Sequence, residues 1–210
     1  MNTFKELLEG NEAWVKDIQQ KEPGLFGNMA EGQHPQFLWI GCADSRVPAE
    51  EITNSLPGSI FMQRNVANLV IHTDYNLLSV VNIAVKILKV KHIIICGHYG
   101  CEGIKAAMSN VSYGLLDNWL SHIKDIYKLN KQELDGIADQ QTRERRFVEL
   151  NVQEQVDNIA KLAFVQEEWK GGNEFPYVHG WVFNVETGGI KNLGLTVNSA
   201  AHLDKVYQYQ

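Results

Sequence analysis

Two short segments, the apolar residues 37–40 and residues 91–97 with three consecutive β-branched Ile residues, limit most strongly what this chain can fold into. Continuous apolar runs of this length are typical of strands that are buried on both faces, as in parallel sheets covered by helices. Residues 75–89, which lie between them, carry apolar side chains at helical spacing. A strand, a helix and a second strand in this order predict a right-handed crossover between parallel strands. The sequence therefore predicts an α/β fold with a mostly parallel central sheet flanked by helices.

The other expected elements complete a single domain spanning residues 1–210. Thr3 and Glu6 form a capping-box pattern that predicts a helix over 3–20, and the Gly- and Pro-containing segment that follows is expected to be a loop. Residues 1–30 are interpreted as an N-terminal helical arm that contacts a second copy in a dimer. The remaining expected elements are strands at 59–64 and 177–185, a hairpin into 190–196, and helices at 100–109, 114–129, 143–169 and 199–208.

Composition excludes several classes of protein. The chain has 210 residues, of which 44% are apolar and 21% charged, which suffices for one substantial core or at most two small domains. Intrinsic disorder and disulfide scaffolds need a different composition. No apolar run approaches the roughly 20 residues that cross a bilayer, and charges interrupt the N-terminal region where a secretory signal would be apolar. A cytoplasmic location without a membrane partner is expected.

The charge pattern argues against nucleic acid as a partner. The chain carries 19 Lys and Arg residues against 25 Asp and Glu residues, a formal net charge of −6. Nucleic-acid binders usually present a basic face, and only residues 143–146 form a basic cluster here. A Glu interrupts this cluster within a predicted helix, so it is interpreted as a solvated helix face.

Polar side chains gather after the two apolar strands. Cys42 and Asp44 follow the first strand, and His98 and Cys101 follow the second. Because ligands of open parallel sheets bind beyond the carboxyl ends of the strands, these four side chains are expected to converge. Two thiolates, one imidazole and one carboxylate suit zinc, although buried spectator thiols would fit the spacing as well. Cys96 lies inside a strand and is expected to be a buried apolar residue.

These motifs resemble the β-class carbonic anhydrases. The resemblance starts from Cys42-Ala43-Asp44-Ser45-Arg46 followed by the His98-x-x-Cys101 pattern. It implies reversible hydration of carbon dioxide to bicarbonate, one zinc ion per chain held by Cys42, His98 and Cys101, and a homodimer that commonly pairs into a tetramer. Further segments that resemble the family are 37–50, 69–78, 92–101 and His179-Gly180-Trp181.

The resemblance also implies roles for three other residues. Zinc in a hydratase lowers the pKa of a bound water and provides hydroxide for attack on carbon dioxide. Asp44, paired with Arg46, is expected to accept a hydrogen bond from this zinc-bound hydroxide. Asp44 binding zinc directly would instead close the site, so it is also a candidate fourth ligand and a switch. An Asp–Arg pair with a purely structural role is the alternative. Gln33 occupies the place of a glutamine that binds bicarbonate in the family.

Trp39 and Arg64 resemble residues of a bacterial subset of the family, in which bicarbonate binds at a second pocket and inhibits the enzyme. In that subset a Tyr completes the pocket, whereas this chain has Phe183 at the matching position. The lost hydroxyl removes one anion contact worth about 1 kcal/mol, so inhibitory bicarbonate is expected to bind weakly. The pH switch through Asp44 is expected to persist.

Two departures and two other functions stay open. Glu102 follows the second zinc cysteine where the family usually has Gly, and it is interpreted as a favourable acidic residue in the first turn of a helix, although it would also add negative charge near the thiolates. A zinc-stabilised binding protein with Asp44 locked on the metal is one alternative function. Hydrolysis of a related heterocumulene, carbon disulfide or carbonyl sulfide, at the same site is the other.

Overall fold

The computed structural model describes residues 3–209, and it consists of two compact units, Met1–His34 and Pro35–Gln210. The first unit contains helix α1 (Phe4–Lys21) and the short helix α2 (Leu25–Ala30). The predicted capping box is confirmed, since the Thr3 hydroxyl accepts from the Glu6 N–H at 3.3 Å and the Thr3 N–H donates to the Glu6 carboxylate at 2.5 Å.

Helix α1 has an amphipathic sequence but buries little of its apolar side. Only Ile18 is buried, and Phe4 stays 80% exposed. Trp14 packs edge-on against Phe26 of α2, with ring centroids 5.6 Å apart. The expectation of a loop after α1 is wrong at α2, because Pro23-Gly24 ends one helix and precedes the next instead of starting a long irregular segment.

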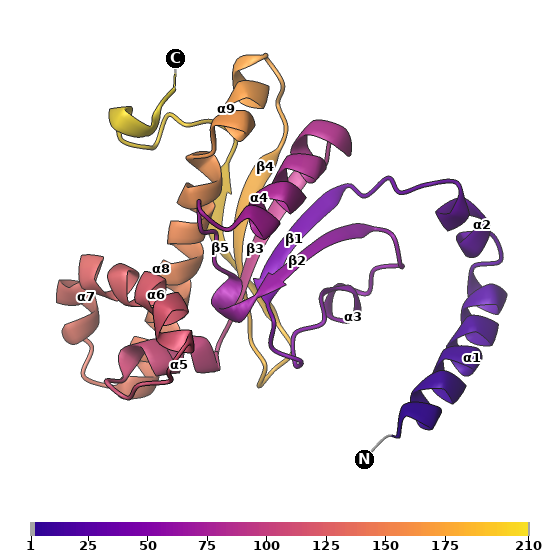
Figure 1. Ribbon diagram of the computed structural model, residues 1–210, viewed down its shortest axis with the longest axis horizontal. Coiled ribbons are helices and arrows are strands. Elements are labelled where there is room, and N and C mark those ends of the chain that lie inside the picture. Colours follow the sequence, from indigo (N-terminus) through magenta and orange to yellow (C-terminus); the bar gives the residue numbers. More distant parts are fainter. Residues whose placement is uncertain (1–2, 210) are drawn as a thin grey trace. The chain divides into compact units, whose positions relative to one another are not determined.

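The second unit is built on a five-stranded sheet, as expected for the α/β class (Figure 1). The strand order is β2-β1-β3-β4-β5; the first four strands are parallel and β5 pairs antiparallel with β4. A hairpin with Gly188 at φ +73° joins β4 to β5, which confirms the expected turn. The strands are β1 (Phe37–Cys42), β2 (Ile60–Asn65), β3 (His92–His98), β4 (Tyr177–Phe183) and β5 (Ile190–Val197).

Helices connect and cover these strands. Most of them follow the expected ranges to within a few residues at each end, but the helix predicted over 75–89 continues from α4 as a π-helical turn, Ile83–Ile87. The short helices α3 and α7 are not predicted, because five residues carry too little periodicity. The helices are α3 (Ala49–Thr53), α4 (Tyr75–Asn82), α5 (Glu102–Met108), α6 (Leu116–Leu129), α7 (Lys131–Asp135), α8 (Gln140–Ala160) and α9 (Ala163–Lys170).

Alternate residues of the strands serve two apolar clusters. Leu38 and Ile40 of β1 belong to the large core formed with α4, α6 and α8. Trp39 points to the opposite face, into a smaller cluster with Ile94 and Cys96 of β3. Both faces of the central strands are thus buried, which explains why their sequences are continuously apolar.

Two predicted helices are wrong in extent. The helix expected over 143–169 is broken at Leu162, which is extended (ψ 123°) and 7% exposed, and α9 begins at the next residue. Its apolar spacing continues through the break, so periodicity alone does not show the turn. The helix expected over 199–208 is only a 3-10 turn, Lys205–Tyr207, because Leu203 alone is buried and a short segment with one buried side chain does not stabilise a helix.

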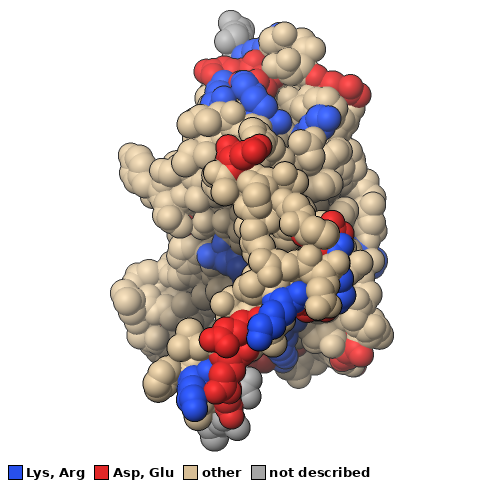
Figure 2. Space-filling view, turned by 90° about the vertical axis from the view of Figure 1, so that its right-hand side faces the viewer, with Lys and Arg blue, Asp and Glu red and all other residues tan. Residues whose placement is uncertain are grey.

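The basic cluster at 143–146 is engaged in contacts within the protein. Arg145 pairs with Glu186 at 2.7 Å, and Arg146 pairs with Glu133 and Glu149 at 2.5 and 3.2 Å. On the face of the molecule drawn in Figure 2, acidic and basic side chains also lie beside one another. Among residues 3–209, no helix combines the length and apolar character needed to span a membrane.

Candidate metal centre and active site

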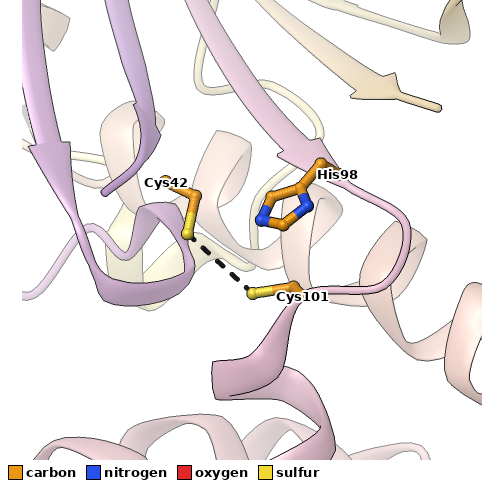
Figure 3. Close-up of side chains that lie close together, drawn as sticks. All are labelled: Cys42, His98 and Cys101. Atoms are coloured by element: carbon orange, nitrogen blue, oxygen red, sulfur yellow. Dashed lines mark hydrogen bonds between the residues drawn. The ribbon is translucent and has the colours of Figure 1, made fainter. Parts of the chain in front are cut away.

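Three side chains from separate segments meet at the carboxyl end of the sheet (Figure 3). Cys42 is the last residue of β1, His98 is the last residue of β3, and Cys101 is the N-cap residue of α5. The Sγ atoms of the two cysteines are 3.9 Å apart, and one ligand atom from each of the three residues lies within 4.8 Å of the others. All three side chains are at least 95% buried. The predicted convergence of two thiols and one imidazole is therefore present.

The imidazole of His98 is oriented for a metal. Its Nδ1 lies 3.1 Å from the carbonyl oxygen of Tyr99, a contact in which only an Nδ1–H can donate. This tautomer leaves a lone pair on Nε2, which is buried and has no hydrogen-bond partner. A buried polar atom without a partner is costly, and a second hydrogen bond that fixes the tautomer is typical of histidine ligands. The donor set of two sulfurs and one nitrogen, with this free Nε2, fits zinc.

The two thiols of the cluster have different proton affinities. A hydrogen bond from Cys101, together with contacts from His98 and backbone N–H groups, lowers the pKa of Cys42 to about 4 against the effect of burial. The same hydrogen bond and burial raise the pKa of Cys101. Even without a cation the pair thus favours one thiolate, which is the form that binds metals.

Two glycines shape the turn that carries Cys101. Gly100 has φ +70°, a conformation that side chains disfavour, and its carbonyl oxygen accepts from Arg46 Nη2 at 3.2 Å. A Cβ on Gly103 would lie 2.8 Å from Val66 Cγ1, so the first turn of α5 packs directly on the segment after β2. These positions explain why the turn after β3 needs glycine.

Asp44 and Arg46 form a tight pair beside the thiols. Arg46 Nε donates to Oδ1 at 2.9 Å, Nη2 donates to Oδ2 at 2.6 Å, and the Arg46 backbone N–H donates to Oδ1 at 2.9 Å. These hydrogen bonds hold the pKa of Asp44 well below its ordinary value. Asp44 Oδ2 lies 3.7 Å from His98 Nε2, while the compact ligand cluster consists of Cys42, His98 and Cys101. The structure therefore brings the expected fourth ligand beside the cluster and pairs it with Arg46.

The three residues of the expected bicarbonate pocket belong to three strands: Trp39 lies within β1, and Arg64 and Phe183 lie near the carboxyl ends of β2 and β4. Trp39 is 1% exposed and Phe183 is 6% exposed, and both belong to the smaller apolar cluster. Arg64 donates from Nε to the Cys42 carbonyl at 2.8 Å and from Nη2 to the Asp44 carbonyl at 2.5 Å. The guanidinium of Arg64 thus supports the backbone on both sides of Ala43.

Gln33, Glu102 and Cys96 are the other residues singled out in the sequence. Gln33 is exposed in the first unit, Met1–His34. The Glu102 side chain is 74% exposed and pairs with Lys105 at 3.1 Å in the first turn of α5. Cys96 is fully buried, and burial raises the pKa of its thiol to about 12, as suits an inert core residue.

Ala67 contributes to the cluster although its residue type does not indicate it. Its backbone N–H donates to Cys42 Sγ at 3.4 Å, so it contacts the cluster through an atom that every residue except proline possesses. The side chain therefore carries no signal of this contact. Polar residues at core positions of a helix, Asn151 and Gln155 in α8, are the one indirect signal, because they hold the segment that contains Ala67.

Comparison with known proteins identifies the family. Residues 37–190 match the family described as "Carbonic anhydrase", and this range includes every residue of the Cys–His–Cys cluster and the Asp44–Arg46 pair. The chain belongs to the carbonic anhydrase family. A carbonic anhydrase of Emericella nidulans is 45% identical over 98% of this chain and 90% of that protein. The expected class of enzyme is therefore confirmed.

Solved structures place the chain in the β class of carbonic anhydrases. One of two tetrameric β-carbonic anhydrases from Sordaria macrospora superposes with a TM-score of 0.87 and 38% identity, covering 94% of this chain and 100% of that chain. A Coccomyxa β-carbonic anhydrase in complex with acetazolamide gives a TM-score of 0.90 at 36% identity, covering 95% and 90%. The predicted fold class and β-class resemblance are confirmed.

Proposed function

We propose that this chain hydrates carbon dioxide reversibly to bicarbonate and a proton, with one zinc ion held by Cys42, His98 and Cys101. Hydration of carbon dioxide is general to the carbonic anhydrase family, to which the chain belongs. The observation that carries the zinc assignment is the buried, unpartnered Nε2 of His98 beside two thiols whose sulfurs are 3.9 Å apart. Bound zinc would supply the Lewis acidity that makes a water molecule nucleophilic near neutral pH.

Asp44 orients the attacking water in this proposal. Its carboxylate is held as an ionised acceptor by the three hydrogen bonds from Arg46, and it lies at the edge of the cluster. A hydrogen bond accepted at Oδ2 would direct the oxygen lone pair of the water toward the carbon atom of carbon dioxide. Arg46 is thus a positioning residue, and its link to the Gly100 carbonyl ties the pair to the turn that carries Cys101.

Asp44 is also proposed as a switch. The 3.7 Å between its Oδ2 and His98 Nε2 means that a small displacement away from Arg46 would bring the carboxylate to the metal. In that arrangement Asp44 would fill the fourth position and exclude water, so the site would be closed. The pairing with Arg46 corresponds to the open state.

Two anion sites follow from the family resemblance. Gln33 is proposed to hydrogen-bond bicarbonate. Trp39, Arg64 and Phe183 are proposed to line a second bicarbonate pocket of the kind found in the regulated bacterial subset, with weaker binding because Phe183 has no hydroxyl. The nearness of Arg64 to the backbone of Cys42 and Asp44 supports a link between this pocket and the switch.

We further propose that the chain forms a homodimer through the arm at residues 1–30, and that dimers pair into a tetramer. Exposed apolar side chains along α1 support this role, because a large exposed apolar patch usually marks an interaction surface. The tetrameric β-carbonic anhydrases of Sordaria macrospora support the larger assembly. The exposed apolar side chains of α1 are Phe4, Leu7, Leu8 and Trp14.

Three free cysteines support a reducing, cytoplasmic location.

One experiment tests the activity. Stopped-flow measurement of carbon dioxide hydration at pH 7 and pH 9, with zinc quantified on the same sample, is expected to show hydration with one zinc ion per chain and higher rates at pH 9. The absence of hydration at both pH values, despite one bound zinc per chain, would contradict the proposal.

A further inference from the structure

Helix α8 carries a row of buried amide side chains in an otherwise apolar face. Asn151 and Gln155 are 1% and 2% exposed, although their neighbours in the helix belong to the main apolar core. Together with the half-buried Asn158, they recur at i, i+4 and i+7 and so lie along one side of the helix. Burying an amide is unfavourable unless its hydrogen bonds are made, so this row, the α8 amide ladder, needs partners.

The partners belong to the backbone of residues 66–70, which follows β2. Asn151 Nδ2 donates to the Ala67 carbonyl at 3.0 Å, and the Val70 N–H donates to Gln155 Oε1 at 2.7 Å. Gln155 Nε2 donates to Asn151 Oδ1 at 3.1 Å, which joins the two amides. Asn158 Nδ2 donates to the Val70 carbonyl at 3.3 Å. The ladder thus satisfies backbone groups that no strand or helix pairs.

The segment needs such support because of its conformation. Ala67 and Asn68 both have positive φ, +63° and +50°, and both are at least 98% buried. Consecutive residues other than glycine in this region are disfavoured and persist only where their surroundings hold them. The conformation directs the Ala67 N–H at Cys42 Sγ, with a distance of 3.4 Å.

We propose that Asn151 and Gln155 are positioning residues of the metal centre, which hold residues 66–70 so that the Ala67 N–H donates a hydrogen bond to the Cys42 sulfur. This inference rests on the proposed zinc site. A hydrogen bond to a thiolate withdraws electron density from the sulfur, and contacts of this outer kind orient ligands and tune the metal. The ladder therefore determines both the position of the Cys42 sulfur and how strongly this sulfur donates electrons to a bound metal, although neither amide contacts a ligand residue.

The test compares variants that lose a buried amide in different places. Asn151→Leu and Gln155→Leu remove the ladder. Gln166→Leu is the matched control, because Gln166 is also 2% exposed and donates to backbone carbonyls, those of Ala160 and Tyr207, away from residues 66–70. Zinc affinity is measured by chelator competition on the full chain. The cobalt-substituted proteins report the energy of the sulfur-to-metal charge-transfer band.

The ladder variants are expected to bind zinc about ten- to a hundredfold more weakly and to shift the charge-transfer band to longer wavelength, because the sulfur becomes more electron-rich. Gln166→Leu is expected to lose thermal stability with neither change. If both ladder variants match Gln166→Leu in zinc affinity, in the energy of the charge-transfer band and in thermal stability, the ladder is merely structural and the inference is overturned.

Asn158→Ala keeps the test decisive if the leucine variants do not fold, because Asn158 is half-buried and donates at 3.3 Å. A smaller shift of the same sign supports the inference, and an unmoved band contradicts it. Failure of the parent protein to bind zinc or cobalt would contradict the proposed zinc site, which is a different outcome from a parent that binds metal and ladder variants that bind it equally well.

Discussion

The guanidinium of Arg46 donates hydrogen bonds to both carboxylate oxygens of Asp44, from Nε to Oδ1 at 2.9 Å and from Nη2 to Oδ2 at 2.6 Å. A forked contact of this kind fixes the direction of a carboxylate as well as its charge, which a single ammonium group does not do. The pair lies 3.7 Å from the nitrogen atom of His98 that faces the thiols. In the proposed mechanism, pairing of Asp44 with Arg46 leaves the centre open to water, and binding of Asp44 to the metal closes it.

Arg46→Lys tests this choice. The variant keeps the positive charge but loses the fork, so Asp44 is expected to turn toward the metal and kcat/KM at pH 7 to fall about ten- to a hundredfold. Stopped-flow hydration assays on zinc-loaded protein measure the effect. Arg145→Lys is the control, because Arg145 pairs with Glu186 at 2.7 Å outside the cluster. An unchanged kcat/KM for Arg46→Lys would show that the fork does not restrain Asp44.

Removal of zinc is expected to lower the stability of the fold. An ion that binds only the folded chain stabilises it by about 2.7 kcal/mol when its free concentration is a hundred times the Kd. Differential scanning calorimetry with and without a chelator should therefore show a lower Tm for the metal-free protein.

Cysteine variants separate ligand from spectator. Cys42→Ser is expected to lose zinc and to show no effect of the chelator on Tm. Cys96→Ala, which removes the buried thiol of β3, is expected to keep one zinc ion per chain. Loss of zinc from Cys96→Ala with retention in Cys42→Ser would reverse the assignment of the two cysteines.

Glu149 gives a prediction for the dependence of stability on pH. Burial would raise its pKa, but hydrogen bonds from Lys191, Tyr99 and Arg146 outweigh burial and lower it. A carboxylate with a lowered pKa stabilises the fold above its unfolded-state pKa, and this contribution is lost as the pH falls through the lower, folded-state value. Glu149→Gln is therefore expected to be destabilised at pH 7 by about 1 kcal/mol, with the gap to the parent closing below about pH 4.

Urea denaturation of both proteins at several pH values measures this gap. The Tyr99 hydroxyl donates to Glu149 at 2.7 Å, so Tyr99→Phe removes one of the three hydrogen-bond partners of Glu149. Its difference in stability from the parent should be smaller than that of Glu149→Gln and should also close as the pH falls. A gap between parent and Glu149→Gln that stays constant from pH 7 to pH 3 would count against the ionised form of Glu149 as the source.

Gly41 is expected to tolerate no side chain. A Cβ at this position would lie 2.5 Å from Nε1 and 3.0 Å from Cδ1 of Trp39, which is 1% exposed and packed in the smaller apolar cluster. Gly41→Ala should therefore be destabilised by about 1–3 kcal/mol in urea denaturation. Gly27→Ala is the control, since a Cβ there meets nothing within 4 Å. Equal stability of the two variants would mean that β1 shifts to accommodate the methyl group.

Phe183→Tyr tests the proposed bicarbonate pocket. Adding the hydroxyl should restore an anion contact of about 1 kcal/mol, so inhibition by bicarbonate should appear at several-fold lower concentration than in the parent. Initial rates measured over a range of bicarbonate concentrations check this. A parent protein that is inhibited as strongly as Phe183→Tyr would remove the argument that Phe183 weakens the pocket.

The main features of the sheet and the metal centre were predictable because they depend on local patterns. Strands buried on both faces are continuously apolar, and parallel strands bring their carboxyl ends together, so Cys42, His98 and Cys101 were expected to meet. The tight turns at Gly100 and Gly188 were likewise marked by residues that tolerate positive φ.

Other features depend on contacts between distant segments and were not predictable. The break at Leu162 does not interrupt the apolar spacing, because this residue is buried in the turn as it would be in a helix. The donor to the Cys42 sulfur is the backbone N–H of Ala67, so the residue type at position 67 does not indicate this hydrogen bond. Residues 199–208 have helix-forming composition but too few buried side chains to make a helix stable.

The parallel pairing of β1 with β3 has a further consequence, for the order in which the protein matures. His98 and Cys101 are close in the sequence, whereas Cys42 joins them only when β1 pairs with β3 and Gly41 comes to lie opposite Cys96. A slip of one residue in this register would turn Cys42 to the wrong side of the sheet. Metal binding would then favour correctly folded chains, since an ion held by all three donors stabilises only the chains whose strands have paired in the right register.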